Sequence, residues 1–346
     1  MSTALGPADS EVHVTAHPGD TFGPWTGRDD VRLPDALLTP VDALPAVDRT
    51  RRRFYQLAGL TVAVESDLPF AERTFSRKFD AFEVISPGAD TLLFRHHFGL
   101  PADTEGDYGD EVHRAVNWVI SHRDGHYIYR GLMGPGHTLD RIAVFNEAHT
   151  RGRILNGPRL EEGFLRGNQN ALTLFPTDQV VVAPALAARD ACYFHSSAVV
   201  LDEAGLVFVG HSEAGKSTIL ELLKDVAVPL CDDRNIIRRW PDGHRIHGTW
   251  SHGQVPIVSP QSAPLRAVLL LKQSADNRLT RMEPVASLAT LLGCVIKPVV
   301  TAAWWRQTLA IVEHIAVSVP VYTMEFDRSG AIVPVLCELC ANGAGD

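Results

Sequence analysis

Residues 210 to 218 of this 346-residue chain read Gly210-His211-Ser212-Glu213-Ala214-Gly215-Lys216-Ser217-Thr218. This is the pattern G-x-x-x-x-G-K-[ST], in which the two glycines let the backbone curl so that successive N–H groups point at phosphate oxygens. Lys216 adds a positive charge for the β- and γ-phosphates, and the Ser217 hydroxyl can ligate Mg²⁺. The pattern therefore predicts that these nine residues form a phosphate-binding loop for ATP and Mg²⁺.

The residues on either side of this loop agree with that prediction. The apolar run Leu206–Val209 before the loop is typical of a buried strand. After the loop, Ile219, Leu222 and Leu223 are spaced to share one face of a helix. Strand, loop and helix N-terminus follow in the required order, and the helix dipole favours an anion at that end. The alternative, a glycine turn that binds nothing, does not account for this context.

The composition describes an ordinary globular protein. Hydrophobic residues make up 45% and charged residues 21%, and the length suits two domains or one large domain with an appendage. The net charge of −9 argues against broad nucleic-acid binding, so we expect no nucleic-acid partner. One basic cluster, Arg49 with Arg51–Arg53, is better explained as a solvated start of a segment than as a docking site for an anion.

The sequence also predicts a cytoplasmic location without a membrane segment. No charged region followed by an apolar region marks a secretory signal, and no apolar run approaches the roughly 18 residues of a membrane span. Five cysteines, an odd number, suit a reducing compartment better than a disulfide scaffold. Cys337 and Cys340 form a lone C-x-x-C, for which two cysteines on a terminal helix are the preferred interpretation over a metal site.

Composition and periodicity divide the chain into three parts. Residues 1–45 are rich in Pro, Gly, Asp and Thr without periodicity and predict a flexible arm. Residues 46–175 predict a β-rich domain, with one strand at Tyr55–Val64 and two strands in 118–129 joined at Asp124-Gly125. Residues 176–340 predict an α/β domain with a mixed sheet around the nucleotide loop, so the overall class is α/β (α+β mixed sheet).

Within this third part the expected elements alternate between strand and helix. The expected helices are 176–190, the helix after the loop, 284–296 and 301–317, and the expected strands are 195–201, 206–209, 226–230, 265–271 and 319–326. Strand 195–201 is expected to pair with 206–209 across the turn 202–205.

A second group of chemically capable residues follows the loop. The short apolar strand Val228–Cys231 ends in Asp232 and Asp233, about fifteen residues beyond the loop lysine. Carboxylates at such a strand end can hold Mg²⁺ directly or through water, and one can orient or deprotonate an attacking hydroxyl. Adjacent side chains on a strand alternate in direction, so these two can divide the roles. Two turn-forming aspartates are the alternative.

Together these segments resemble a known family. His195-Ser-Ser-Ala-Val-Val, the loop at 210–218 and Cys231-Asp-Asp-Arg234 are similar to the catalytic core of the HPr kinase/phosphorylase family, and more closely to its stand-alone bacterial relatives. The family shares its nucleotide fold with phosphoenolpyruvate carboxykinase. The resemblance implies catalytic roles for His195, Lys216, Asp232 and Asp233, with Ser217 and Asp233 holding Mg²⁺ and Asp232 favoured as the base.

The resemblance extends more weakly over residues 54–336, and it has limits. The Glu-Arg-Gly signature of the bifunctional enzymes and their Pro-Gly-Arg-Asn segment are absent from the sequence, so neither phosphorolysis nor HPr as the acceptor is expected. His247 and His252 lie where relatives carry a loop near the acceptor; contact with phosphate or substrate and local structural hydrogen bonds both stay open. Arg234, Arg238 and Arg239 can contribute charge at the phosphate or lie on the strand surface.

The leading hypothesis is an ATP-dependent kinase that transfers the γ-phosphoryl group to a hydroxyl, with serine of a peptide or small protein as the expected acceptor. A nucleotide-binding regulatory module without transfer, and a small-molecule kinase or carboxykinase-like enzyme, are the alternatives. The sequence contains neither an N-K-x-D nor an L-S-G-G-Q motif, which disfavours a GTPase and an ABC-type ATPase. The acceptor, the role of residues 1–45 and any homo-oligomer stay open.

Overall fold

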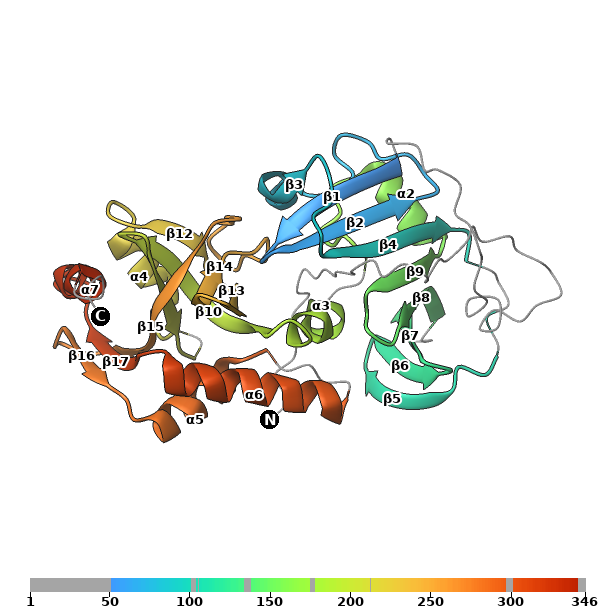
Figure 1. Ribbon diagram of the computed structural model, residues 1–346. Helices are drawn as coiled ribbons and strands as arrows, with labels where there is room; N and C mark the ends of the chain where they lie inside the picture. The colour runs from blue at the N-terminus through green and yellow to red at the C-terminus, as the bar shows by residue number, and fades with distance from the viewer. Residues whose placement is uncertain are drawn as a thin grey trace. The chain divides into compact units, whose positions relative to one another are not determined.

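The chain divides into two compact units (Figure 1). The structure, a computed structural model, describes residues 51–100, 104, 106–133, 138–174, 178–211, 213–296 and 301–341. The first unit contains Met1–Ala185 with Val299–Thr301, and the second contains Leu186–Pro298 with Ala302–Asp346. The predicted arm at 1–45 and Ser212 of the loop lie outside the described residues. Each unit is built on one mixed sheet, so the chain has an α/β fold.

The first unit contains a nine-stranded sheet in the order β3-β1-β2-β4-β9-β8-β7-β6-β5. Its strands are β1 (Arg52–Leu57), β2 (Leu60–Ser66), β3 (Glu83–Val84), β4 (Thr91–Phe98), β5 (Asp110–Ala115), β6 (Trp118–Arg123), β7 (His126–Met133), β8 (Thr138–Asn146) and β9 (Arg151–Asn156). The β2–β4 and β4–β9 pairs are parallel and the remaining pairs are antiparallel.

Two hairpins test the predictions for this unit. The predicted single strand Tyr55–Val64 was wrong, because β1 and β2 fold back on each other in register from Arg52↔Glu65 to Leu57↔Leu60. Ala58 and Gly59 make the turn with φ of 48° and 81°, a left-handed pair that matches the twist of a two-residue hairpin. The predicted turn at Asp124-Gly125 is confirmed between β6 and β7.

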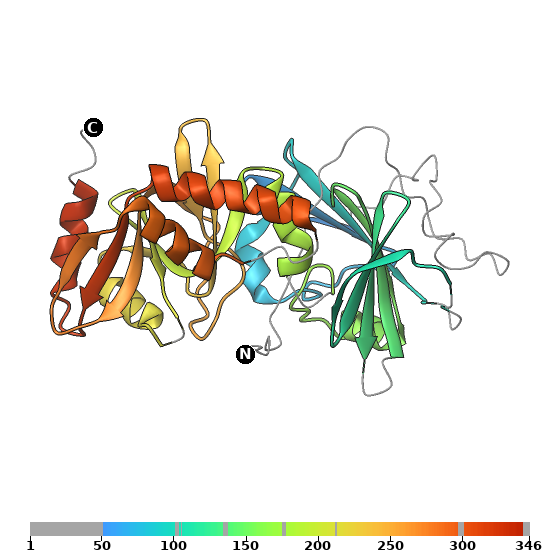
Figure 2. The same ribbon diagram turned by 90° about the horizontal axis from the view of Figure 1, so that it is seen from below.

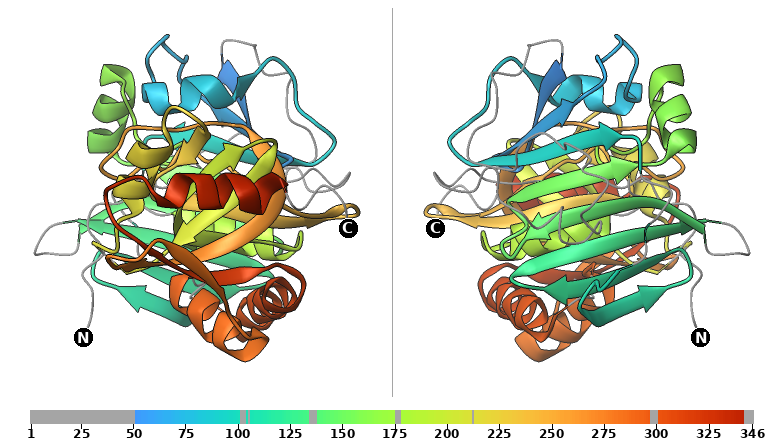
Figure 3. Two further views of the ribbon diagram at one scale, coloured as in Figure 1. Left: turned by 90° about the vertical axis from the view of Figure 1, so that its left-hand side faces the viewer. Right: turned by 90° about the vertical axis from the view of Figure 1, so that its right-hand side faces the viewer.

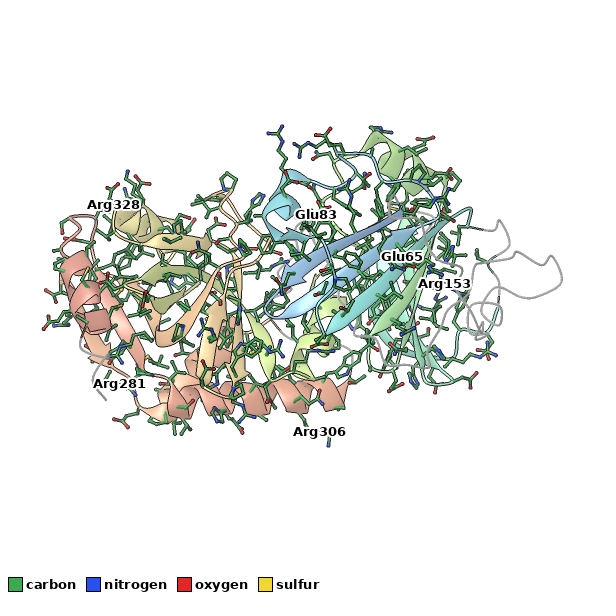
Figure 4. The ribbon with its side chains drawn as sticks, turned by 45° about the horizontal axis from the view of Figure 1, so that its top comes forward. Glu65, Glu83, Arg153, Arg281, Arg306 and Arg328 are labelled. Atoms are coloured by element: carbon green, nitrogen blue, oxygen red, sulfur yellow. The ribbon has the colours of Figure 1, made fainter. Side chains whose placement is uncertain are left out.

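The two faces of this sheet differ in chemistry. The 3₁₀ helix η2 (Arg77–Phe82) and helix α2 (Pro158–Arg166) contribute to an aromatic cluster, in which the ring centroids of Tyr55 and Phe79 lie 5.8 Å apart. The other face of the sheet carries charged side chains. On it, Glu65, Arg95 and Arg153 are register neighbours across β2, β4 and β9. Figure 4 marks Glu65 and Arg153 on this sheet. Alternation along each strand thus separates an apolar face from a charged one.

The second unit contains an eight-stranded sheet. Its strands are β10 (Ala191–Leu201), β11 (Ala204–Val209), β12 (Val228–Cys231), β13 (Arg234–Trp240), β14 (Gly243–His247), β15 (Ser262–Gln273), β16 (Arg278–Arg281) and β17 (Val321–Phe326). The order is β11-β10-β13-β14-β15-β17-β16, with β12 on β10. Because β11 also pairs in parallel with β15, five of these strands close into a ring.

Helices cover both sides of this second sheet. They are α4 (Lys216–Leu223), α5 (Pro284–Cys294), α6 (Ala302–Ser318) and α7 (Ile332–Ala341). Helix α3 (Asp178–Ala187) contains the point in the sequence at which the first unit ends. One buried cluster joins the sheet to α5 and α6, and another joins it to α4 and α7. Figure 2 shows α5 beside α6, and the left view of Figure 3 shows α7 across the strands. The loop between β11 and α4 is therefore anchored from both sides.

The sequence located these elements well in the second unit. The strands predicted at 206–209, 265–271 and 319–326 and the helices predicted at 284–296 and 301–317 are confirmed as β11, β15, β17, α5 and α6 within a few residues. The predicted β10–β11 hairpin is also confirmed. Cys337 and Cys340 lie on α7, a terminal helix as expected. Among the helices of the described ranges, none combines the length and apolar character required to cross a membrane.

Candidate active site

The predicted phosphate loop, residues 210–218, runs from the end of β11 into the first turn of α4. Gly215 caps α4 with φ of 104°, a left-handed conformation that side-chain-bearing residues rarely adopt. A Cβ atom at Gly215 would also lie 2.8 Å from Cζ of Phe326, so the position has no room for a side chain. A Cβ atom at Gly210 would lie 2.7 Å from Cβ of Ala214. Both glycines are therefore needed for the tight curl of the loop.

Lys216 lies folded back on this loop. Its Nζ donates to the backbone carbonyl of Gly210 at 3.0 Å and to that of His211 at 3.2 Å. Burial lowers the pKa of Lys216, while the negative charges of Asp233 and Asp232 act in the opposite direction. The ammonium group thus lies within electrostatic reach of both aspartates, although they follow it by about fifteen residues in sequence.

Asp232 holds the β14–β15 loop, residues 248–261. Its Oδ1 accepts the backbone N–H of Gly253 and its Oδ2 accepts that of Val255, both at 2.7 Å. The residue is only 6% exposed. Both oxygens of the carboxylate are engaged by backbone N–H groups of this one loop. In this structure Asp232 therefore positions the loop.

Asp233 points to different partners. Its Oδ1 lies 3.0 Å from Nδ1 of His195, and its Oδ2 lies 3.3 Å from Nε of Arg234. Burial raises the pKa of Asp233, but the hydrogen bond from His195 and the positive charges of Arg234 and Lys216 outweigh it, and the net pKa is lowered. Asp233 is thus an ionised carboxylate between a histidine and the loop lysine.

Buried polar residues fix the backbone that carries these groups. Ser196 N–H donates to the Asp233 carbonyl at 2.9 Å, and the Ser197 hydroxyl donates to the Asp232 carbonyl at 3.1 Å. The Asn235 amide donates to the carbonyls of Ser196, at 2.8 Å, and of Cys231, at 3.2 Å. Sequence reasoning missed Asn235; its signal was a lone amide directly before the apolar pair Ile236-Ile237 in the strand that follows the two aspartates. These bonds lock β10 against the β12–β13 turn.

The structure places the other predicted site residues as follows. Lys216, Asp232, Asp233 and His195 gather at one end of the second sheet. Ser217 and Thr218 lie in the first turn of α4, with Ser217 exposed; in the preceding loop His211 and Glu213 are exposed and Ala214 is buried. His252 lies beside the site with Nδ1 3.2 Å from the Gly253 carbonyl.

His247 does not join this group. Its Nε2 accepts a hydrogen bond of 3.1 Å from Nε1 of Trp240, and burial together with Arg238 and Arg245 lowers its pKa to about 3. This is the structural role that the sequence left open for it. Arg239 forms an ion pair with Asp190 at 2.8 Å, and Arg238 stacks over Trp240. Of the three arginines considered, only Arg234 contacts a site residue.

The residues present fit a magnesium ion. Within the described ranges no group of three His, Cys, Asp or Glu residues is arranged to hold a metal. Mg²⁺ needs no such cage, because it binds one or two carboxylates and completes its shell with water and phosphate oxygens. Ser217 and Asp233 offer hard oxygen donors, and each Asp233 oxygen has a further lone pair beyond the contact it makes.

Comparison with known proteins adds little beyond this geometry. No protein-family model matches the sequence, and no curated protein matches it. Among solved structures 41 chains match, including the Hpr(Ser) kinase/phosphatase from Coxiella burnetii. That match has a TM-score of 0.27 and 10% sequence identity, and it covers 43% of this chain and 88% of the other. At this TM-score the match carries no argument about the fold or the activity of this chain.

Proposed function

We propose that this chain is an ATP-dependent kinase that transfers the γ-phosphoryl group of ATP to a hydroxyl, with serine of a peptide or small protein as the expected acceptor. The observation that carries the proposal is the convergence of a phosphate-loop lysine with a hydrogen-bonded carboxylate–histidine pair. Lys216 and Asp233 lie close enough for each charge to shift the pKa of the other. A loop that only sensed nucleotide would not need the Asp233–His195 pair.

Each group has a role in this proposal. The N–H groups of the phosphate loop and Lys216 bind the phosphates, and Ser217 with Asp233 would hold Mg²⁺, which neutralises phosphate charge. The Asp233 carboxylate accepts from Nδ1–H of His195, so Nε2 of His195 carries a lone pair. His195 is about half exposed, and its Nε2 is the atom we assign to receive the proton of the acceptor hydroxyl. This assignment differs from the expectation that Asp232 is the base.

Asp232 contributes differently in this scheme. Because both of its oxygens hold the β14–β15 loop, it fixes one wall beside the reacting groups. Positioning of this kind and charge neutralisation supply most of the acceleration in phosphoryl transfer. Asp232 is therefore a positioning residue.

The test is transfer from γ-labelled ATP to a serine-containing peptide library, followed by mass spectrometry of the phosphorylated sites. The purified chain is expected to label peptides, and Lys216→Ala is expected to lose both ATP binding and labelling. Lys224→Ala serves as the matched control, since Lys224 lies at the exposed end of α4 and its ammonium group pairs with Glu221. ATP binding without labelling of any peptide, protein or small-molecule hydroxyl would favour a nucleotide-binding regulatory module instead.

A further inference from the structure

A second cleft lies in the same unit, between the β13–β14 hairpin and α6. It contains two adjoining cavities of about 730 and 410 Å³. Both are lined by Asp190, Arg239, His244 and His314. None of these residues belongs to the phosphate loop or contacts Lys216, Asp233 or His195 through a bond described above. Each volume lies in the range typical of small-molecule sites.

The histidines of this cleft are held in one tautomer. The Ser318 hydroxyl donates to the backbone carbonyl of His314 at 2.6 Å, so its only hydrogen is used. Its oxygen lies 3.2 Å from Nδ1 of His314 and 3.4 Å from Nδ1 of His244, and it can only accept from them. Neutral His244 therefore carries its proton on Nδ1 and a lone pair on Nε2.

That lone pair is the unusual feature. Nε2 of His244 is buried and has no hydrogen-bond partner within the described part of the chain. Burial, with the nearby His314 and Arg239, lowers the pKa of His244 to about 4, so the ring is neutral near pH 7. A buried acceptor without a donor costs free energy, which a ligand that brings a donor can recover.

Three charged residues line the larger cavity, Asp190, Arg239 and Asp242, and the first two form an ion pair. Nη2 of Arg239 lies 2.8 Å from Oδ2 of Asp190, and both side chains are about half exposed. A guanidinium has five N–H donors, so Arg239 can bind a second carboxylate while it keeps Asp190. Asp190 can likewise accept from a cation. The cleft thus offers one site for an anion and two acceptors for a donor cation.

The remaining lining combines apolar residues with the polar side chains of Asp242, Gln307 and Ser318. Trp240, Pro264, Leu265 and Val319 line the larger cavity, and Ala310 and Ile311 line the smaller one. A ligand that matches the whole cleft carries a carboxylate, an ammonium group and a hydrocarbon side chain. We propose that this cleft binds a free apolar α-amino acid as its zwitterion, with the carboxylate on Arg239, the ammonium group on His244 and Asp190, and the side chain on the apolar wall.

The experiment is isothermal titration calorimetry of the full chain with L-leucine and two analogues. L-leucine, or another apolar amino acid from a panel of valine, isoleucine, methionine and phenylalanine, is expected to bind saturably. For leucine the analogues are 4-methylpentanoate, which lacks the ammonium group, and leucinamide, which lacks the carboxylate. Each analogue of the binding amino acid is expected to bind at least about tenfold more weakly, because one charged partner stays unpaired.

Variants then locate the site. Arg239→Gln and His244→Phe are each expected to weaken binding about tenfold or more, while Arg328→Gln, an exposed arginine labelled in Figure 4, leaves it unchanged. Thermal melts of each variant show that it is folded. Absence of saturable binding by every amino acid of the panel, binding of both analogues as tight as that of the amino acid itself, or unchanged binding in both cleft variants would overturn the proposal. ATP titration of the same variants reports on the phosphate loop separately.

Discussion

Nδ1 of His195 lies 3.0 Å from Oδ1 of Asp233; His195 is on β10, and Asp233 is in the turn between β12 and β13. The pair orients the imidazole and leaves its Nε2 directed away from the carboxylate. His195↔Arg234 is also a register pair of β10 and β13. The sheet itself therefore sets this contact, which supports a fixed site and not a chance surface ion pair.

Replacing His195 tests the proton acceptor. In the proposed scheme His195→Gln removes the lone pair at Nε2 and lowers transfer by about 10²–10⁴-fold, while the dissociation constant for ATP changes little. Asp232→Asn is expected to lower transfer less, since Asp232 only positions the loop. Single-turnover rates with labelled ATP measure both. The reverse order, with His195→Gln nearly normal and Asp232→Asn inactive, would return the base to Asp232. Asp225→Asn, an exposed aspartate after α4, is the control.

Removing the Asp232 carboxylate should free the β14–β15 loop. Asp232→Ala leaves the backbone N–H groups of Gly253 and Val255 without their acceptor, and it is expected to lower stability by about 1–3 kcal/mol. Hydrogen exchange at these two amides should accelerate, while exchange in β15 stays slow. Unchanged protection at both amides would show that another contact holds the loop. Asp225→Ala provides the matched comparison.

Alanine variants of Gly215 and Gly243 distinguish the effect of a steric clash from the effect of backbone strain. Gly215→Ala places a methyl group 2.8 Å from Phe326 at a φ of 104°, and it is expected to weaken ATP binding at least about tenfold. Gly243→Ala also imposes a positive φ, of 125°, but its methyl group would meet nothing within 4 Å. That variant should lose about 1–2 kcal/mol of stability and keep wild-type ATP binding. Equal ATP binding by both variants would argue against a role for the loop curl.

His247 predicts acid sensitivity of the fold. Its pKa is about 3 in the folded protein and about 6.5 when unfolded, so the unfolded state binds more protons between these values. Its contribution is therefore complete above about pH 6.5 and is lost as the pH falls towards 3. Denaturant midpoints at pH 7 and pH 5 measure this loss.

A variant isolates the histidine from the rest of the chain. His247→Phe should reduce the loss of stability between pH 7 and pH 5 by on the order of 2 kcal/mol. The neighbouring change Ile246→Val, in the same strand, should lower stability equally at both values because it creates a small cavity without a titrating group. A loss between the two pH values that is the same in wild type and His247→Phe would show that other groups carry the acid sensitivity.

Local patterns in the sequence were enough to predict the strand–glycine loop–helix order at 206–223 and most elements of the second unit. A loop glycine with φ of 104°, the apolar run of β11 and the helical spacing of α4 all depend on near neighbours in the chain. The same reasoning failed at Tyr55–Val64, because a turn at Ala58-Gly59 interrupts an otherwise continuous apolar pattern and only the pairing of β1 with β2 reveals it.

Only the tertiary structure determined which partners each of the candidate site residues contacts. Asp232 and Asp233 are identical and adjacent in sequence, yet one meets two backbone amides of the β14–β15 loop and the other meets His195 and Arg234. From the sequence, His247 and His252 were equally plausible contacts for phosphate or substrate. In the structure His247 lies on β14 and is buried against Trp240. These outcomes depend on strand register and on contacts between segments distant in sequence, for which a single chain read in order carries no local signal.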